Sequence, residues 1–275
     1  MKEIIVAIDF SNCSLHALDY AIMIANHHHA NVKMIWVDNQ SSPEMVFTHE
    51  EQAVRQEMKG YFEEILLKYG PKLIKGKLDY KLRMGKVFNE VSAQAKHDDA
   101  FLIVTGTHGV SGFEKYWVGS NTYRIVTNAP CPVVIVRKEF AFGNTIKNLV
   151  IPIDSTKDSI EKLIFTSELA KVFDAQLHVL AVYPQMIKAL KLKVDQNIEK
   201  AIQYLDENKV KFAVETVMSD DLTGALINYA TLQKVDLIAI MTEQGVTNSS
   251  VFLGPNARQI INNSPIPVLN IRPKI

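Results

Sequence analysis

Apolar runs recur along the chain, and segments with helical periodicity separate them. In the first half these runs predict strands near 3–9, 32–37, 77–83, 101–106 and 133–137. The intervals between them predict helices near 14–28, 44–69, 86–97 and 119–128. The runs FLIVTG and PVVIV do not alternate with polar positions, which is typical of strands covered on both faces. The pattern therefore predicts a parallel sheet with helices on both sides.

The second half repeats this order, with strands predicted near 147–153, 177–182, 210–217, 236–241 and 266–271. KEIIVAID (Lys2–Asp9) matches KNLVIPID (Lys147–Asp154) at an offset of 145 positions. NAPCPVVIVR (Asn128–Arg137) matches NSPIPVLNIR (Asn263–Arg272) at an offset of 135, so the first copy is ten residues longer in its middle. We therefore expect two tandem α/β domains, 1–138 and 147–275, each with a doubly wound, open, parallel five-stranded sheet.

Composition and charge narrow the range of partners. With 275 residues, of which 47% are hydrophobic and 22% charged, the chain has the composition of a folded protein. Lys plus Arg equals Asp plus Glu at 30 each, which leaves no basic excess for an extended nucleic acid or an anionic membrane. A membrane helix needs an apolar run of about 18 residues, which does not occur, and the first residues lack the plan of a secretory signal. We therefore expect a cytoplasmic protein.

Candidate chemistry lies where strands of the first copy end, which is where doubly wound sheets bind ligands. The first predicted strand ends in Asp9, and the fourth runs into Gly106-Thr107-His108-Gly109. Gly119-Ser120-Asn121-Thr122 then opens the next helix, giving the pattern Gly-x2-Gly-x9-Gly-Ser. Glycines let the backbone approach a ligand closely, and a helix N-terminus favours an anion such as phosphate. The spacing predicts a phosphate cradle that is neither a Walker nor a Rossmann motif.

Asp9 together with Gly106-x2-Gly109-x9-Gly119-Ser120 resembles the ATP-binding universal stress protein family, in its tandem-domain form. The closing PCPVVIVR (Pro130–Arg137) is similar to the last strand of that family. The resemblance covers nearly the whole chain. It implies the strand order 3-2-1-4-5, a fold like that of adenine nucleotide alpha hydrolases, and a nucleotide across the ends of the first and fourth strands.

The resemblance also implies roles for individual residues of the first copy. Asp9 would face the nucleoside, and Val37, at the end of the second strand, would contact adenine. Gly106 and Gly109 would let the loop wrap the ribose and phosphates. The phosphate chain of ATP or ADP, with Mg²⁺, would take backbone and hydroxyl donors from Gly119, Ser120, Asn121 and Thr122.

The second copy loses most of this pattern. At the offset of 135, Met241 stands at the position of Gly106, Gln244 at that of Gly109 and Pro255 at that of Ser120. Of the three glycines and the serine in the motif, only Gly119 keeps its counterpart, Gly254. Because proline has neither an N–H nor a hydroxyl, two phosphate donors disappear together. We expect a degenerate site in which Asp154 is a polar residue at a strand end.

Some of these residues also have simpler interpretations that do not involve a ligand. Asp9 is equally suited to cap the helix that begins near Ser11. The run His27–His29 predicts a solvated helix end, because consecutive helical residues point about 100° apart and do not converge on one metal ion. His108 lines the loop without an acid or arginine at a spacing that would make it a catalytic base. Cys13 and Cys131 are expected to be packing residues.

These observations leave more than one function open. The leading hypothesis is a cytoplasmic ATP-binding regulator of the stress response that acts through its first domain. An enzyme hydrolysing ATP is one alternative, although the lack of a paired catalytic group predicts at most very slow turnover. The other alternative is a scaffold with vestigial sites, which binds another small ligand or a protein partner through the second copy. A homo-oligomer also stays open.

Overall fold

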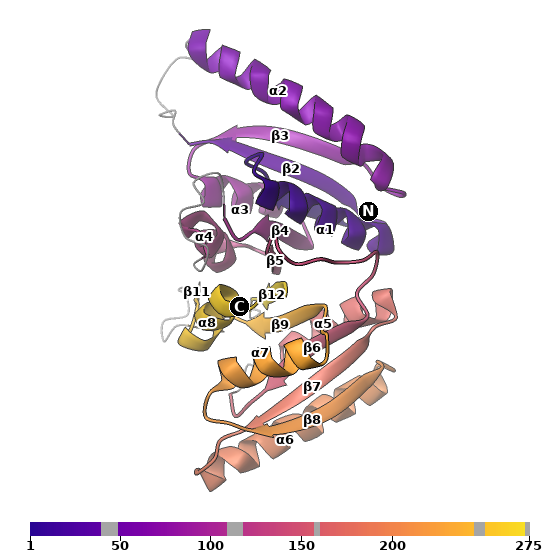
Figure 1. The fold of residues 1–275 in the computed structure, drawn as a ribbon, viewed down its shortest axis with the longest axis vertical. Helices are drawn as coiled ribbons and strands as arrows, with labels where there is room; N and C mark the ends of the chain where they lie inside the picture. Colours follow the sequence, from indigo (N-terminus) through magenta and orange to yellow (C-terminus); the bar gives the residue numbers. More distant parts are fainter. Residues whose placement is uncertain (40–48, 109–117, 157–159, 245–250, 273–275) are drawn as a thin grey trace. The chain divides into compact units, whose positions relative to one another are not determined.

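A computed structural model describes residues 1–39, 49–108, 118–156, 160–244 and 251–272 (Figure 1). The chain divides into two compact units, Met1–Lys138 and Glu139–Ile275. The two units are described separately.

The first unit alternates strands and helices along the chain (Figure 1). Its elements are β1 (Glu3–Ala7), α1 (Asn12–His28), β2 (Asn31–Asp38), α2 (His49–Tyr69), a 3₁₀ turn (Gly70–Lys72), β3 (Leu78–Met84), α3 (Val87–His97), β4 (Leu102–Gly106), α4 (Ser120–Asn128) and β5 (Val133–Val136). The described strands are parallel and lie in the order β3-β2-β1-β4-β5. The predicted fold class and strand order are confirmed for this unit.

The second unit repeats the arrangement. Its main elements are β6 (Asn148–Ile153), α5 (Lys162–Phe173), β7 (Gln176–Tyr183), α6 (Lys188–Glu207), β8 (Phe212–Met218), α7 (Leu222–Leu232), β9 (Leu237–Met241), α8 (Pro255–Asn263) and β12 (Val268–Ile271). The parallel order β8-β7-β6-β9-β12 is that of the first unit. A short antiparallel pair, β10 (Glu243–Gln244) with β11 (Val251–Phe252), was not predicted from the sequence.

Strand register confirms the repeat residue by residue. In the first unit Ile4 of β1 lies opposite Leu102 of β4, and in the second Leu149 of β6 lies opposite Leu237 of β9. These pairs are related by the same two offsets, 145 and 135, that the sequence shows. The ten additional residues of the first copy therefore leave its central strands in place.

The sheet core explains why the central strands β1, β4 and β5 are mainly apolar. Ile4, Ile5 and Val6 of β1 are fully buried, and the residues of β5 are buried as well. Strands covered by helices on both faces have no position that favours a polar side chain. β1 ends at Ala7, two residues before the predicted end, and α1 begins at Asn12. Asp9 therefore lies in the turn between the two elements.

Candidate functional site

Asp9 holds the turn that joins β1 to α1. Its Oδ1 accepts hydrogen bonds from the Ser11 backbone N–H at 3.1 Å and from the Ser11 hydroxyl at 2.6 Å. Ser11 caps α1 by accepting a hydrogen bond from the Ser14 N–H at 3.2 Å. The capping role predicted as an alternative for Asp9 is therefore taken by Ser11, and Asp9 orients that cap. The half-buried carboxylate stays at the carboxyl end of the sheet.

Phe10, between these two residues, has a left-handed backbone with φ of 63°. A non-glycine residue in this region is strained by about 1–3 kcal/mol and needs support from its surroundings. The support comes from α2, where the Phe10 ring packs against Tyr61 at 5.4 Å and Phe62 at 5.0 Å between ring centroids. Phe62 in turn stacks on Tyr80 of β3 at 4.5 Å. This aromatic group fixes the path of the chain past Asp9.

Gly106, the last residue of β4, is glycine because α1 approaches it. A Cβ atom at this position would lie 2.6 Å from Cys13 Sγ and 3.1 Å from the Cys13 carbonyl carbon. Cys13 is buried, and its Sγ lies 3.7 Å from Thr107 Oγ1, so it is a packing residue as predicted. The family resemblance implies that Gly106 lets the loop wrap a ligand. The structure gives it a second role, which is to seat the first turn of α1 against β4.

Helix α4 begins with a cap that has no side chain. Gly119 is the N-cap, its own N–H donates to the Thr107 carbonyl at 2.8 Å, and its carbonyl accepts from the Tyr123 N–H at 3.0 Å. The N–H groups of Ser120, Asn121 and Thr122 precede that first intrahelical bond, and a glycine cap has no oxygen to accept them. Ser120 and Asn121 are exposed.

Thr122 is placed differently from its two neighbours. Its side chain is buried, and its hydroxyl donates to the Gly106 carbonyl at 2.8 Å. That hydroxyl therefore joins α4 to the end of β4, a use that the sequence pattern did not indicate. The contacts Thr122–Gly106, Gly119–Thr107 and Cys13–Thr107 bring together the β4 end and the starts of α1 and α4.

The remaining predicted residues lie around this centre. Val37 is buried near the end of β2, opposite Arg83 of β3. Gly109 lies outside the described residues. His108 is half-buried, and its Nδ1 lies 3.0 Å from Thr107 Oγ1. Within the part of the chain that the structure describes, its Nε2 has no hydrogen-bond partner.

The second unit keeps the glycine cap of the cradle and loses two donors, the N–H and the hydroxyl that Ser120 has in the first unit. Gly254 caps α8 with φ of −58° and ψ of 163°, close to the −58° and 150° of Gly119. Pro255 then removes the first N–H, and Met241 occupies the β9 position that matches Gly106. Asp154 Oδ1 accepts from Thr156 N–H at 2.9 Å and from its hydroxyl at 2.5 Å, as Asp9 does from Ser11.

The prediction that α1 ends in a solvated run of histidines is wrong at His28. His28 is half-buried, with its ring 5.0 Å from that of Phe101, so the helix end is not solvated at this residue. Burial, aided by the nearby charges of Lys2 and His27, lowers the pKa of His28 to about 4. The described residues contain no group of three or more His, Cys, Asp or Glu side chains placed to hold a metal ion. They also contain no helix both long and apolar enough to cross a membrane.

Comparisons with known proteins agree with the repeat. The model of the Universal stress protein family matches residues 1–137 and again residues 145–272. A universal stress protein of Methanocaldococcus jannaschii is 32% identical over 149 residues, a match that covers 50% of this chain and 82% of that protein.

Two solved structures share the fold over nearly the full length. A universal stress protein from Archaeoglobus fulgidus has a TM-score of 0.75 at 18% identity, covering 98% of this chain and 96% of that one. A functionally unknown protein from Pseudomonas aeruginosa has a TM-score of 0.67 at 15% identity, covering 99% and 93%.

Proposed function

The chain belongs to the universal stress protein family, and from this premise we propose that its first unit binds ATP or ADP with Mg²⁺. In this proposal the protein is a cytoplasmic regulator of the stress response, and it acts when the nucleotide is bound to its first unit. The observation that carries the proposal is the start of α4, where the N–H groups of Ser120, Asn121 and Thr122 follow a glycine cap. Such a helix start favours a phosphate group through both hydrogen bonds and the helix dipole.

The other residues of the cradle suit the rest of a nucleotide. Asp9 is held at the sheet end by Ser11, where its carboxylate can accept hydrogen bonds from hydroxyl groups of the ribose. Val37, near the end of β2, would offer its backbone and side chain to a base. Gly109, in the adjoining loop, would permit close approach of the backbone. The α4 start and Asp9 lie on adjacent parts of the same sheet end, as a nucleotide requires.

This arrangement is compatible with a Mg²⁺ ion that binds together with the phosphates of the nucleotide. Mg²⁺ keeps several waters and is usually bound by one or two carboxylates together with substrate phosphates. The absence of a three-residue metal cluster among the described residues is therefore compatible with an ion that arrives with the nucleotide. Its chemistry here would be to offset phosphate charge.

Binding rather than turnover is the activity that we propose. His108 Nδ1 contacts Thr107 Oγ1, and within the described part of the chain no carboxylate is hydrogen-bonded to this imidazole to orient it as a base. We expect ATP hydrolysis to be far slower than ordinary enzymatic rates. A measured rate of the order of 1 s⁻¹ would favour the ATPase alternative.

The test transfers residues of the second copy into the first, as Ser120→Pro and Gly109→Gln. Proline removes one N–H donor, and glutamine adds bulk where the backbone must approach the phosphates. Since hydrogen bonds to charged groups contribute roughly 1.5–3 kcal/mol each, ATP affinity should fall about tenfold to several-hundredfold. Isothermal titration calorimetry with Mg²⁺ and ATP measures this change.

Stability distinguishes a damaged site from a damaged fold. The thermal midpoint without ligand should change little, because proline is tolerated in the first helical turn and α8 already begins with Pro255. Gly143→Gln is the matched control, since Gly143 is exposed and has open space around its Cβ position. If a folded double variant binds ATP as tightly as the unmodified protein, the nucleotide binds elsewhere and the site assignment is wrong.

A further inference from the structure

The start of α6 in the second unit carries apolar side chains that lie on the surface. Met186 is 89% exposed, Ile187 54% and Leu192 55%. Ile187 is the N-cap of α6, and Leu192 lies on the side of the helix almost opposite the buried Val194. Because α6 packs against β6 and β7 through its buried side, Leu192 faces away from the sheet. These side chains are therefore accessible to a partner.

Met218, at the end of β8, extends this apolar surface. It is 60% exposed and lies opposite Tyr183 of β7, so the two side chains share one face of the sheet. The Tyr183 hydroxyl donates to Asp195 Oδ1 of α6 at 2.7 Å, which shows that this face is the one that α6 covers. The Ser219 N–H donates to the Tyr183 carbonyl at 2.9 Å and joins the two strand ends. Met218 therefore lies beside the first turns of α6.

Lysines accompany the apolar side chains at the start of α6. Lys188, Lys191 and Lys193 lie in its first two turns, and Lys188 and Lys193 are exposed. The first turn contains no acidic residue, although a helix N-terminus favours negative charge. The surface is therefore both apolar and cationic, and it favours a partner that brings carboxylates together with apolar contacts.

Helix α2 of the first unit has such a surface around Gly60. α2 packs against β3, and Gly60 lies on its exposed side with no atom within 4 Å of its Cβ position (Figure 1). Leu67, two turns further on the same side, is 81% exposed. The four residues three and four positions before and after Gly60 are also exposed, and three of them are acidic: Gln56, Glu57, Glu63 and Glu64.

The first unit itself gives no reason for a glycine at this position. Gly60 lies inside α2 without a positive φ, so no turn requires it, and glycine destabilises a helix interior relative to alanine. No neighbouring atom needs the space that its missing side chain leaves. Lys59 and Tyr61 point about 100° to either side of it. A gap bordered by four helical residues suits a side chain from another helix, as in knobs-into-holes packing.

We propose that the start of α6 of one molecule binds this side of α2 of a second molecule of the same protein. Leu192 would lie over Gly60, and the ammonium groups of Lys188 and Lys193 would pair with the surrounding carboxylates. Each molecule offers one surface of each kind, so the contact is head-to-tail and forms chains or closed rings. No residue of the proposed nucleotide site takes part, so this proposal does not depend on that site.

The experiment is sedimentation velocity of the full-length protein without nucleotide, over a range of protein concentrations and at two salt concentrations. We expect self-association that weakens as salt rises. Lys188→Glu with Lys193→Glu, or Glu57→Lys with Glu64→Lys, should weaken it by at least about tenfold, because like charges then face each other. All four changes in one chain should restore association, which a misfolded variant would not do.

Gly60→Leu tests the packing without changing charge. Leucine would fill the space above α2 and block Leu192, so association should be lost. The thermal midpoint should not fall, because leucine favours a helix more than glycine does. Ala93→Leu is the matched control, since Ala93 is an exposed small residue of another helix, α3, and should leave association unchanged.

Three results would overturn the proposal. The first is a protein that remains monomeric up to about 1 mM. The second is association of undiminished strength in the folded Gly60→Leu variant or in either charge-reversed pair, which would place the contact elsewhere. The third is a monomeric protein that sediments with phosphatidylserine vesicles and loses this binding in the Lys188→Glu, Lys193→Glu variant, which would assign the start of α6 to a lipid surface.

Discussion

At the scale of single residues, Gly106 shows how packing and ligand binding come to depend on one position. Its missing side chain lets the first turn of α1 contact the end of β4, and its carbonyl accepts the Thr122 hydroxyl that joins α4. We therefore expect Gly106→Ala to lower the thermal midpoint, because the added methyl group would lie 2.6 Å from Cys13 Sγ and 3.1 Å from its carbonyl carbon. Overpacking of this kind costs roughly 1–3 kcal/mol, which denaturant unfolding measures directly.

The cause of that loss can be separated from a general effect of alanine. Gly60→Ala is the control, because Gly60 lies in the exposed interior of α2 with open space at its Cβ position, and alanine favours helix there by up to about 1 kcal/mol. Removing the Cys13 sulfur in the double variant Gly106→Ala/Cys13→Ala should restore part of the stability. Equal destabilisation of Gly106→Ala with and without Cys13 would contradict the packing explanation.

At the scale of elements, the sequence predicted which segments are helices and strands, and most differences lie at their ends. β1 stops at Ala7 because Asp9 and Ser11 form a hydrogen-bonded turn, with Phe10 in a left-handed conformation that no local pattern indicates. The pattern did place Gly119 and Ser120 at a helix start. It did not predict that the Thr122 hydroxyl points inward, since that depends on a contact with β4, sixteen residues earlier.

The end of α1 supports a prediction about pH. A histidine near a helix C-terminus is favoured in its charged form by the dipole, but burial of His28 outweighs this and, with Lys2 and His27, lowers its pKa from 6.5 to about 4. The folded protein then keeps His28 neutral where the unfolded chain binds a proton. Stability from this group is complete above about pH 6.5 and is lost as the pH falls toward 4.

Substituting His28 by phenylalanine removes the titration and keeps a ring against Phe101. The fall in thermal midpoint between pH 6.5 and pH 4 should therefore be smaller in this variant than in the unmodified protein. His178, whose pKa burial also lowers, contributes to the slope that remains in both proteins. His29→Asn, at the exposed left-handed residue that ends α1, is the control and should keep the original slope. Identical slopes for all three proteins would exclude His28 as the source.

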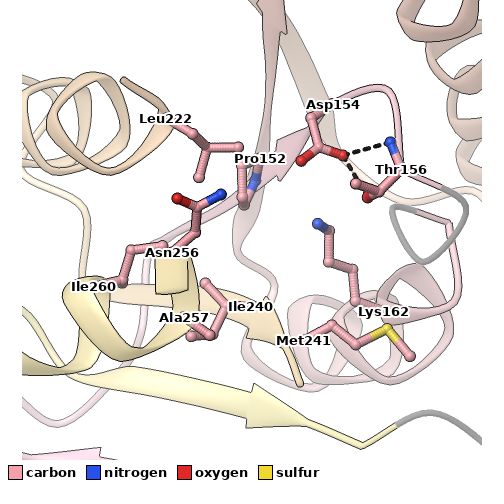
Figure 2. A pocket seen from close by; sticks show the side chains of 10 residues that line it. All are labelled: Pro152, Asp154, Thr156, Lys162, Leu222, Ile240, Met241, Asn256, Ala257 and Ile260. Atoms are coloured by element: carbon pink, nitrogen blue, oxygen red, sulfur yellow. Dashed lines mark hydrogen bonds between the residues drawn. The ribbon is translucent and has the colours of Figure 1, made fainter. Parts of the chain in front are cut away.

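At the scale of the whole molecule, the repeat was the most predictable feature, because finding it requires only matching similar segments and counting the positions between them. The offsets of 145 and 135 reappear in the strand register of both units, so the sheet of each copy followed from the sequence. The buried position of Lys162 did not follow, because it requires knowing that α5 directs its first residue into the pocket that Asp154 and Met241 also line (Figure 2). The two copies therefore differ at this position, where the second has the Lys162 ammonium group and the first has the Ala17 methyl group.

If these substitutions account for the difference between the copies, reversing them should restore a second nucleotide site. The variant carries Lys162→Ala, Met241→Gly, Gln244→Gly, Pro255→Ser and Ala257→Thr, each the residue found at the matching position of the first copy. The chain between Met241 and Gly254 has the same number of residues as that between Gly106 and Gly119, so no loop needs to change length. Calorimetry should then give about two ATP per chain where the unmodified protein gives about one.

Returning Pro255 alone to this variant should weaken the new site by about tenfold or more, because one N–H donor to a phosphate is lost. A folded variant that still binds a single ATP would mean that the lost donors are not what distinguishes the two units.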